Sequence, residues 1–250
     1  MWKVVRASVA GTSHRDSRLP CQDHSVAKVI GRKHLMCVVA DGAGGAALGG
    51  KGAETACAMV ESRAKNLFGR GKRPVFGRAL AEQWTGDIRE ALRMEALKWN
   101  RSASDYACTL SVALVSPGEA LFFQIGDGAI VVSTKDVLGV VFWPEEVPYA
   151  NMTHFLTDED ALCHLDVHVT KTSVFEIALL TDGLFRLALS CAQQVPHIPF
   201  FEPLFREIGR QTPRKCRALS RQLGSFLDST GVNGRTDDDK TLVLATRRTP

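Results

Sequence analysis

The sequence lacks several features that identify common classes of protein. Its seven cysteines are scattered and form no CxxC pair, which argues against a disulfide framework and against a cysteine zinc site. No apolar run approaches the ~20 residues that span a bilayer. Residues 1–20 also have no continuous apolar segment of the signal-peptide kind. We therefore expect a cytoplasmic protein that does not cross a membrane.

Long blocks of like charge are also absent. The net charge is only +4 and no block of five like charges occurs, so nothing indicates a nucleic-acid partner. No repeat or low-complexity linker divides the 250 residues, of which 45% are hydrophobic. Such a chain is long enough to bury a substantial core. We predict a single domain over residues 1–250, acting as a monomer.

The pattern of apolar residues predicts both strands and helices. Strands are expected at 2–10, 24–31, 34–40, 106–115, 119–125, 129–133, 137–143, 174–182 and 241–247. Helices are expected at 53–69, 74–99, 200–210 and 214–228, and a polar loop at 11–20. Because strands come in runs with the helices grouped between them, we predict an α+β fold with antiparallel sheets and helices outside.

A glycine-rich stretch, DGAGGAALGGKG at residues 41–52, follows the buried strand at 34–40. It nearly matches the P-loop pattern, but Gly52 stands where a magnesium-binding hydroxyl is needed. It also nearly matches a dinucleotide-binding turn. That fold needs a second strand with an acid about 20 residues on, and residues 53–69 predict a helix instead. Both nucleotide interpretations are therefore disfavoured.

Aspartates recur where apolar strands end or begin. They are Asp23, Asp41, Asp127, Asp182 and the run Asp237–Asp239. A single one, such as Asp41, could equally be a helix N-cap. If the groups converge at one edge of a sheet, cations must offset their repulsion, and oxygen ligands favour Mg²⁺ or Mn²⁺. Two such ions could bind phosphate and activate a water for attack on phosphorus, with the glycines letting the backbone approach that phosphate.

The motifs RLPCQD, VVADGAGG, IGDG, LLTDG and DDKTLVLA, in this order, resemble the signature of the protein phosphatase 2C family. The resemblance covers almost the whole chain. It implies a central β-sandwich of two antiparallel sheets flanked by helices. It also implies metal-dependent hydrolysis of phosphoserine and phosphothreonine in proteins, with phosphoprotein substrates and a cognate serine/threonine kinase as partners.

The family pattern implies roles for particular residues. Asp41 matches the aspartate that bridges two Mn²⁺ or Mg²⁺ ions, and Gly42 matches the residue that offers its carbonyl to one of them. Asp182 and Asp238 match further ligands, with Asp238 preferred over its two aspartate neighbours. Asp23 matches an acid that holds an ion through a water.

Other positions match the pattern less fully. Arg18 matches the phosphate-binding arginine. Asp127 is a candidate ligand for a third ion, with a β-turn aspartate as the equal alternative. Gln22 stands where the family often has glutamate, and Ala43 replaces a histidine assigned as general acid in some members. His14 is a candidate replacement acid, and a plain loop residue is the equal alternative.

Two alternative functions remain open on the sequence. One is a catalytically silent binding or regulatory module, which the departures at Gln22 and Ala43 favour. The other is a phosphohydrolase acting on small molecules. Outside the aspartates, Thr157 and Asp160 predict a capping box that starts a helix. The histidines, including His154 and His164, show no zincin spacing.

Overall fold

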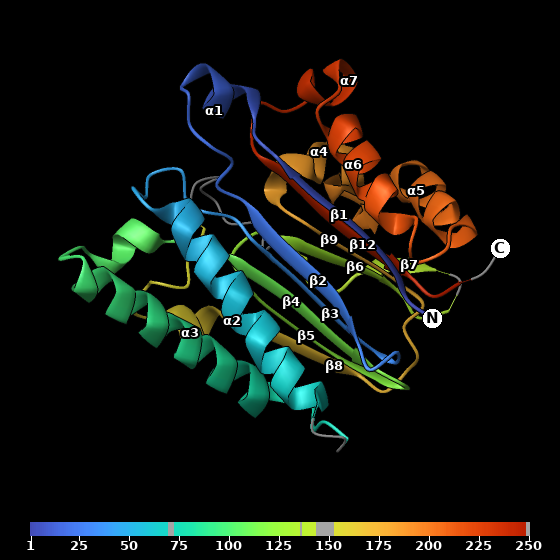
Figure 1. The fold of residues 1–250 in the computed structure, drawn as a ribbon, viewed down its shortest axis with the longest axis horizontal. Coiled ribbons are helices and arrows are strands. Elements are labelled where there is room, and N and C mark those ends of the chain that lie inside the picture. Colours follow the sequence, from blue (N-terminus) through green and yellow to red (C-terminus); the bar gives the residue numbers. More distant parts are fainter. Residues whose placement is uncertain (70–72, 136, 144–152, 249–250) are drawn as a thin grey trace.

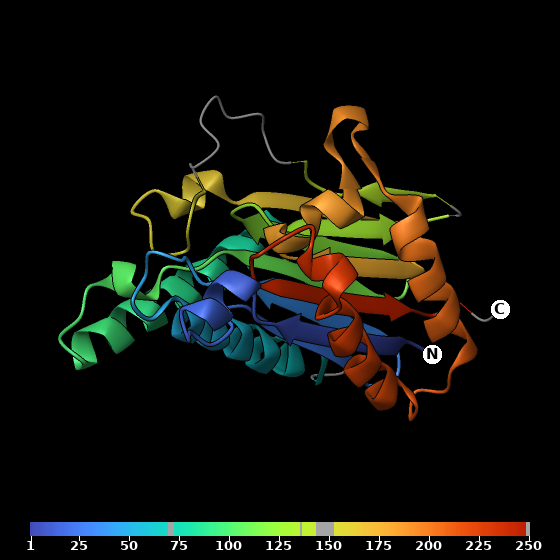
Figure 2. The same cartoon turned by 90° about the horizontal axis from the view of Figure 1, so that it is seen from above.

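The protein is described here from a computed structural model, which places residues 1–69, 73–135, 137–143 and 153–248. Two antiparallel sheets lie face to face, and helices cover the outer face of each (Figures 1 and 2). The predicted α+β architecture of a helix-flanked β-sandwich is confirmed.

Each main sheet has five strands. The first has the order β1 (Lys3–Val9), β12 (Lys240–Thr246), β9 (Glu176–Leu180), β6 (Ala129–Ser133) and β7 (Leu138–Val140). The second has the order β2 (His24–Ile30), β3 (His34–Ala40), β4 (Leu110–Ser116), β5 (Glu119–Ile125) and β8 (Asp166–Thr170). A two-stranded ribbon pairs β10 (Leu189–Ser190) with β11 (Val195–Pro196).

The helices form the two outer layers and the connections. α2 (Gly49–Gly69) and α3 (Arg78–Lys98) cover the second sheet, whereas α4 (Phe185–Ala188), α5 (Ile198–Arg210) and α6 (Cys216–Leu227) lie on the first. The short helices are α1 (Thr12–Asp16) and α7 (Thr230–Asn233), with 3₁₀ turns η1 (Ala103–Tyr106), η2 (Ala161–His164), η3 (Asp182–Leu184) and η4 (Cys191–Gln193).

Strand β3 shows why the layers stack in this way. Its side chains alternate: Met36 and Val38 pack under α2 and α3, whereas Leu35 and Cys37 face the other sheet. All four are fully buried. Because successive residues of a strand point to opposite faces, a continuous apolar run is what a sheet covered on both sides requires.

The structure also departs from the sequence-based expectations. The polar segment 11–20 contains α1, and the irregular region after residue 153 contains β8, which no pattern indicated. The capping box predicted at Thr157 and Asp160 is wrong. Only the 3₁₀ turn η2 follows, Asp160 makes no capping hydrogen bond, and its carboxylate pairs with His164 instead.

Two further observations bear on the expectations from composition. All seven cysteines are free thiols, in agreement with the predicted absence of disulfides. Within the described part of the chain, no helix is both long and apolar enough to cross a bilayer.

Candidate active site

Four of the predicted aspartates line one small cavity at the end of the sandwich. Asp41 follows β3, Asp127 lies in the turn between β5 and β6, Asp182 begins η3 after β9, and Asp238 precedes β12. The cavity has a volume of about 190 Å³. The elements that supply these residues come from both sheets, so the packing of the sandwich brings the carboxylates together.

The main chain at Asp41 is fixed on both sides by Thr109. The Asp41 amide donates to Thr109 Oγ1 at 3.0 Å, and the Thr109 amide donates to the Asp41 carbonyl at 2.8 Å. Gly42 bridges to Cys108 next to this pair, and its amide donates to the Gln22 carbonyl at 3.2 Å. Asp41 therefore leaves the strand in a defined direction, facing the cavity.

Asp23 lies behind the cavity wall rather than in its lining. It is 6% exposed, and its Oδ2 accepts a hydrogen bond of 2.8 Å from Thr181 Oγ1. The same threonine oxygen accepts the Thr241 amide at 3.1 Å. Thr181 thus connects the ends of β9 and β12 to the carboxylate of Asp23.

Burial, and after it the charges of neighbouring carboxylates, raises the pKa values of these carboxyl groups. Burial, and to a lesser extent the charge of Asp239, raises the pKa of Asp23 to about 7, although the Thr241 and Thr181 side chains lower it. Burial and then the charges of Asp127 and Asp238 raise the pKa of Asp182 to about 6. The pKa of Asp41 is raised further still, by burial first and then by Asp23, Asp182 and Asp238. The protein alone does not balance these charges.

A bound cation fits this arrangement. Asp23 Oδ1 and Asp182 Oδ1 are buried and have no hydrogen-bond partner in the described chain, although buried polar atoms are nearly always paired. Gln22 Oε1 is a third such oxygen. Hard oxygen ligands of this kind suit Mg²⁺ or Mn²⁺.

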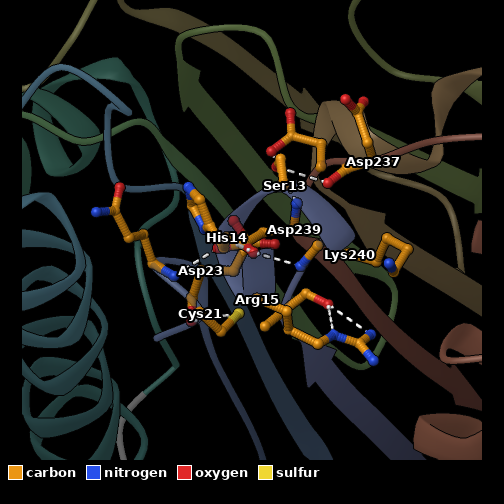
Figure 3. A network of polar contacts seen from close by, with 12 residues as sticks. Ser13, His14, Arg15, Cys21, Asp23, Asp237, Asp239 and Lys240 are labelled. Atoms are coloured by element: carbon orange, nitrogen blue, oxygen red, sulfur yellow. Dashed lines mark hydrogen bonds and ion pairs between the residues drawn. The ribbon is translucent and has the colours of Figure 1, made fainter. Parts of the chain in front are cut away.

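The three consecutive aspartates before β12 have separate roles. Asp238 lines the cavity. Asp239 is 2% exposed and accepts hydrogen bonds from the amides of Gly11 and Gln22, at 2.7 and 2.5 Å. The carbonyl of Asp237 accepts both the amide and the hydroxyl of Ser13 in α1 (Figure 3). Asp237 and Asp239 therefore hold the N-terminal loop in place.

His14 lines the cavity from α1, and its Nδ1 lies 2.9 Å from Asp239 Oδ1 (Figure 3). A buried carboxylate at this distance orients the imidazole ring and favours a proton on Nδ1. Ala43 also lines the cavity and offers no titratable group. Arg18 is exposed and is not among the lining residues, so its role in binding phosphate stays a prediction.

The glycines of the 41–52 stretch serve close backbone packing as well as the cavity. A Cβ on Gly42 would lie 2.4 Å from the Gly49 carbonyl carbon, and one on Gly52 would lie 2.0 Å from the Tyr106 oxygen. These positions let the start of α2 approach the loop and η1. Gly44, in contrast, lines the cavity with no neighbouring atom within 4 Å of such a Cβ.

Sequence reasoning missed three threonines of the site. Thr109 and Thr153 line the cavity, and Thr153 Oγ1 donates to Asp127 Oδ2 at 2.5 Å. Thr181 supports Asp23. The only available signal was position, since Thr181 directly precedes Asp182 in TDG. Nothing in the sequence indicated the other two.

Comparisons with known proteins identify the family of this chain. The family model described as Protein phosphatase 2C matches residues 10–228. Serine/threonine-protein phosphatase 3 of Escherichia coli (strain K12) is 40% identical over 248 residues, covering 98% of each chain. A bacterial serine phosphatase structure superposes with a TM-score of 0.66 at 18% identity, covering 100% of this chain and 99% of that one.

The phosphatase Stp1 of Staphylococcus aureus has a TM-score of 0.63 at 19% identity, covering 98% of this chain and 95% of its own. At such identities the two structures support the fold, whereas the family model and the E. coli relative identify the family. The chain belongs to the protein phosphatase 2C family and is a protein phosphatase of the bacterial type.

Proposed function

We propose that this phosphatase hydrolyses phosphoserine and phosphothreonine in proteins, using two Mn²⁺ or Mg²⁺ ions held by the carboxylate cavity. The observation that carries the proposal is the group of four lining aspartates, with unpartnered oxygens on Asp23 and Asp182. The family and the names of the relatives support the reaction. Phosphoproteins and a cognate kinase are the partners that this function implies.

Each proposed ligand has a place in the arrangement. The charge interactions of Asp41 with Asp23, Asp182 and Asp238 support a role as the shared ligand of two ions, which the Gly42 carbonyl would join. Asp182 and Asp238 complete the set, Asp23 acts through a water, and Asp127 is the candidate for a third ion. When bound, the ions supply positive charge that stabilises phosphate oxygens and makes a water acidic enough to attack phosphorus.

The chain's own groups would control the proton and the substrate. His14, oriented by Asp239, can donate a proton from the cavity wall to the leaving serine or threonine oxygen. Arg18 would bind phosphate if its exposed side chain turns toward the cavity mouth, because a guanidinium matches phosphate oxygens in pairs.

The test is hydrolysis of a phosphothreonine peptide and of p-nitrophenyl phosphate, each titrated with Mn²⁺ and Mg²⁺ after chelation. Asp41→Asn should lower kcat at least about 100-fold, equal to ~2.7 kcal/mol of transition-state stabilisation, because the charge between the ions is lost. Full activity of this variant would contradict the bridging role.

Asp238→Asn and Asp237→Asn form a matched pair for the last ligand. The two residues are neighbours, but only Asp238 lines the cavity. We expect the first variant to lose metal-dependent activity and the second to keep it. A preference for the small ester over the peptide would support the small-molecule phosphohydrolase. Metal binding without turnover of either substrate would support the silent module.

A further inference from the structure

A second group of metal-ligating side chains lies beside the carboxylate cavity. The rings of His154 and His164 stack, with centroids 3.4 Å apart and planes 9° apart. His164 Nε2 lies 3.1 Å from Asp160 Oδ2. One ligand atom from each of these three side chains lies within 4.8 Å of the other two. We propose that His154, Asp160 and His164 bind a divalent transition-metal ion, with Zn²⁺ as the representative.

The donor set separates this site from the cavity. Two imidazoles and one carboxylate leave a fourth position for water, which is a common Zn²⁺ arrangement. Imidazole nitrogen selects Zn²⁺, Cu²⁺ or Ni²⁺, whereas a set made only of oxygens selects Mg²⁺ or Mn²⁺. The two sites therefore discriminate between metals by ligand chemistry, and millimolar Mg²⁺ should leave the histidine site free.

The ligand spacing requires only side-chain rotation. Ligands of a tetrahedral Zn²⁺ ion at 2.0–2.1 Å are separated by roughly 3.3 Å, close to the distance between His164 and Asp160. The stacked rings must tilt toward one ion, because each nitrogen lone pair lies in its ring plane. The side chains of His154 and His164 are 36% and 35% exposed, so they have room to turn.

The backbone that carries these ligands is already held in place. Leu156 and Ala161 are fully buried against the α3 side of the core. Arg89 of α3 donates to the carbonyls of Leu156 and Glu159, at 2.8 and 3.2 Å. A metal site formed on a fixed backbone loses little conformational entropy when the ion binds.

Metal binding here would also act on the active site. His154 lies between Thr153 and Phe155, which both line the carboxylate cavity. An ion joining His154 to His164 would therefore tie the cavity wall to η2. We expect Zn²⁺ to slow hydrogen exchange at the amides of residues 155–164, including the Leu156 amide that donates to Cys108.

The test is equilibrium dialysis of the full chain against Zn²⁺ in millimolar Mg²⁺. The wild type should bind one Zn²⁺ more per chain than His154→Gln or His164→Gln, and Co²⁺ should give a visible absorption band that both variants lose. His168→Gln is the matched control, because His168 is an exposed histidine four residues beyond His164. It should bind as the wild type does.

Cys163→Ser is a second control, since Cys163 is exposed and adjacent to His164. Equal Zn²⁺ binding by the wild type and both histidine variants would overturn the proposal. So would loss of the bound ion in Cys163→Ser alone, because the thiol would then be the ligand. Melting curves of each variant in Mg²⁺ confirm that the chain is folded. None of these readouts depends on phosphatase activity.

Discussion

Gln22 places a neutral side chain next to the carboxylates of the site. It precedes Asp23, its carbonyl accepts the Gly42 amide, and its side-chain oxygen is buried without a partner. A neutral amide oxygen can contact a cation but contributes no net charge. An acid at this position would therefore change the number of negative charges around the site.

Replacing Gln22 by glutamate should therefore tighten metal binding. One added charge a few ångströms from an ion contributes a few kcal/mol at an effective dielectric near 20, and the extra repulsion among the carboxylates offsets part of that. We expect Gln22→Glu to lower the Mn²⁺ concentration for half-maximal activity about tenfold, or ~1.4 kcal/mol. Gln83→Glu, an equal charge change on the exposed face of α3, should leave it unchanged.

The sequence predicted the carboxylates of the site but not their supports. Asp41, Asp127, Asp182 and Asp238 could be found because each lies at a strand end and is costly to bury without a partner. Asp239 could not be separated from Asp238 in this way, since both are aspartates of one run. Only the tertiary contacts of Asp239 with Gly11 and Gln22 show that it holds the loop.

At the scale of elements, helix α2 depends on a glycine at one crossing point. Gly52 meets the Tyr106 carbonyl of η1, where a Cβ would lie 2.0 Å from the oxygen. The helical pattern placed the start of this helix at residue 53, where its apolar face begins, and glycine has a low helix propensity. Tertiary packing overrides that propensity, and α2 begins at Gly49.

Two glycine-to-alanine changes distinguish the effect of close packing from the effect of helix propensity on the free energy of unfolding. Gly52→Ala should lower the free energy of unfolding by roughly 3 kcal/mol, because the helix must shift away from η1. Gly86→Ala in α3 meets no atom within 4 Å and should raise it by roughly 0.5–1 kcal/mol. Urea denaturation followed by circular dichroism measures both. Similar effects from the two changes would contradict this account of Gly52.

Short elements fixed by distant contacts were the ones that sequence patterns missed. Helix α1 has only five residues, and its position rests on hydrogen bonds from Ser13 to Asp237. Strand β8 alternates weakly and pairs with β5 at the sheet edge. Long strands such as β3 and β12 were predictable, because burial on both faces gives each a continuous apolar run.

At the scale of the whole molecule, the sandwich forces its own carboxylates together. Strand ends from both sheets meet at one end, and the folded chain brings Asp23, Asp41 and Asp182 into a partly dehydrated space. The same packing that stabilises the core thus destabilises the metal-free site. Stability and metal binding are therefore coupled through protons.

This coupling predicts how the chelated protein responds to pH. Carboxyl groups with raised pKa values keep protons in the folded state that the unfolded chain releases near pH 4. Their stabilising contribution is complete below that pH and is lost as the pH rises through about 6 to 7. The chelated wild type should therefore lose stability relative to Asp41→Asn over this range, because its unfolded chain releases the Asp41 proton that the folded chain keeps, whereas the asparagine has no proton to release.

The measurement is the difference in free energy of unfolding between chelated Asp41→Asn and chelated wild type, followed from pH 5 to pH 8. It should grow in favour of the variant by at most about 1.4 kcal/mol per pH unit for each proton involved. Asp237→Asn, which lies outside the cavity, should give a flat difference. Added Mn²⁺ should make the wild type more stable than Asp41→Asn. The cation can replace the proton of the Asp41 carboxyl group, whereas the asparagine cannot become charged. If the difference in free energy of unfolding for Asp41→Asn does not change with pH, burial does not raise the pKa values of these carboxyl groups.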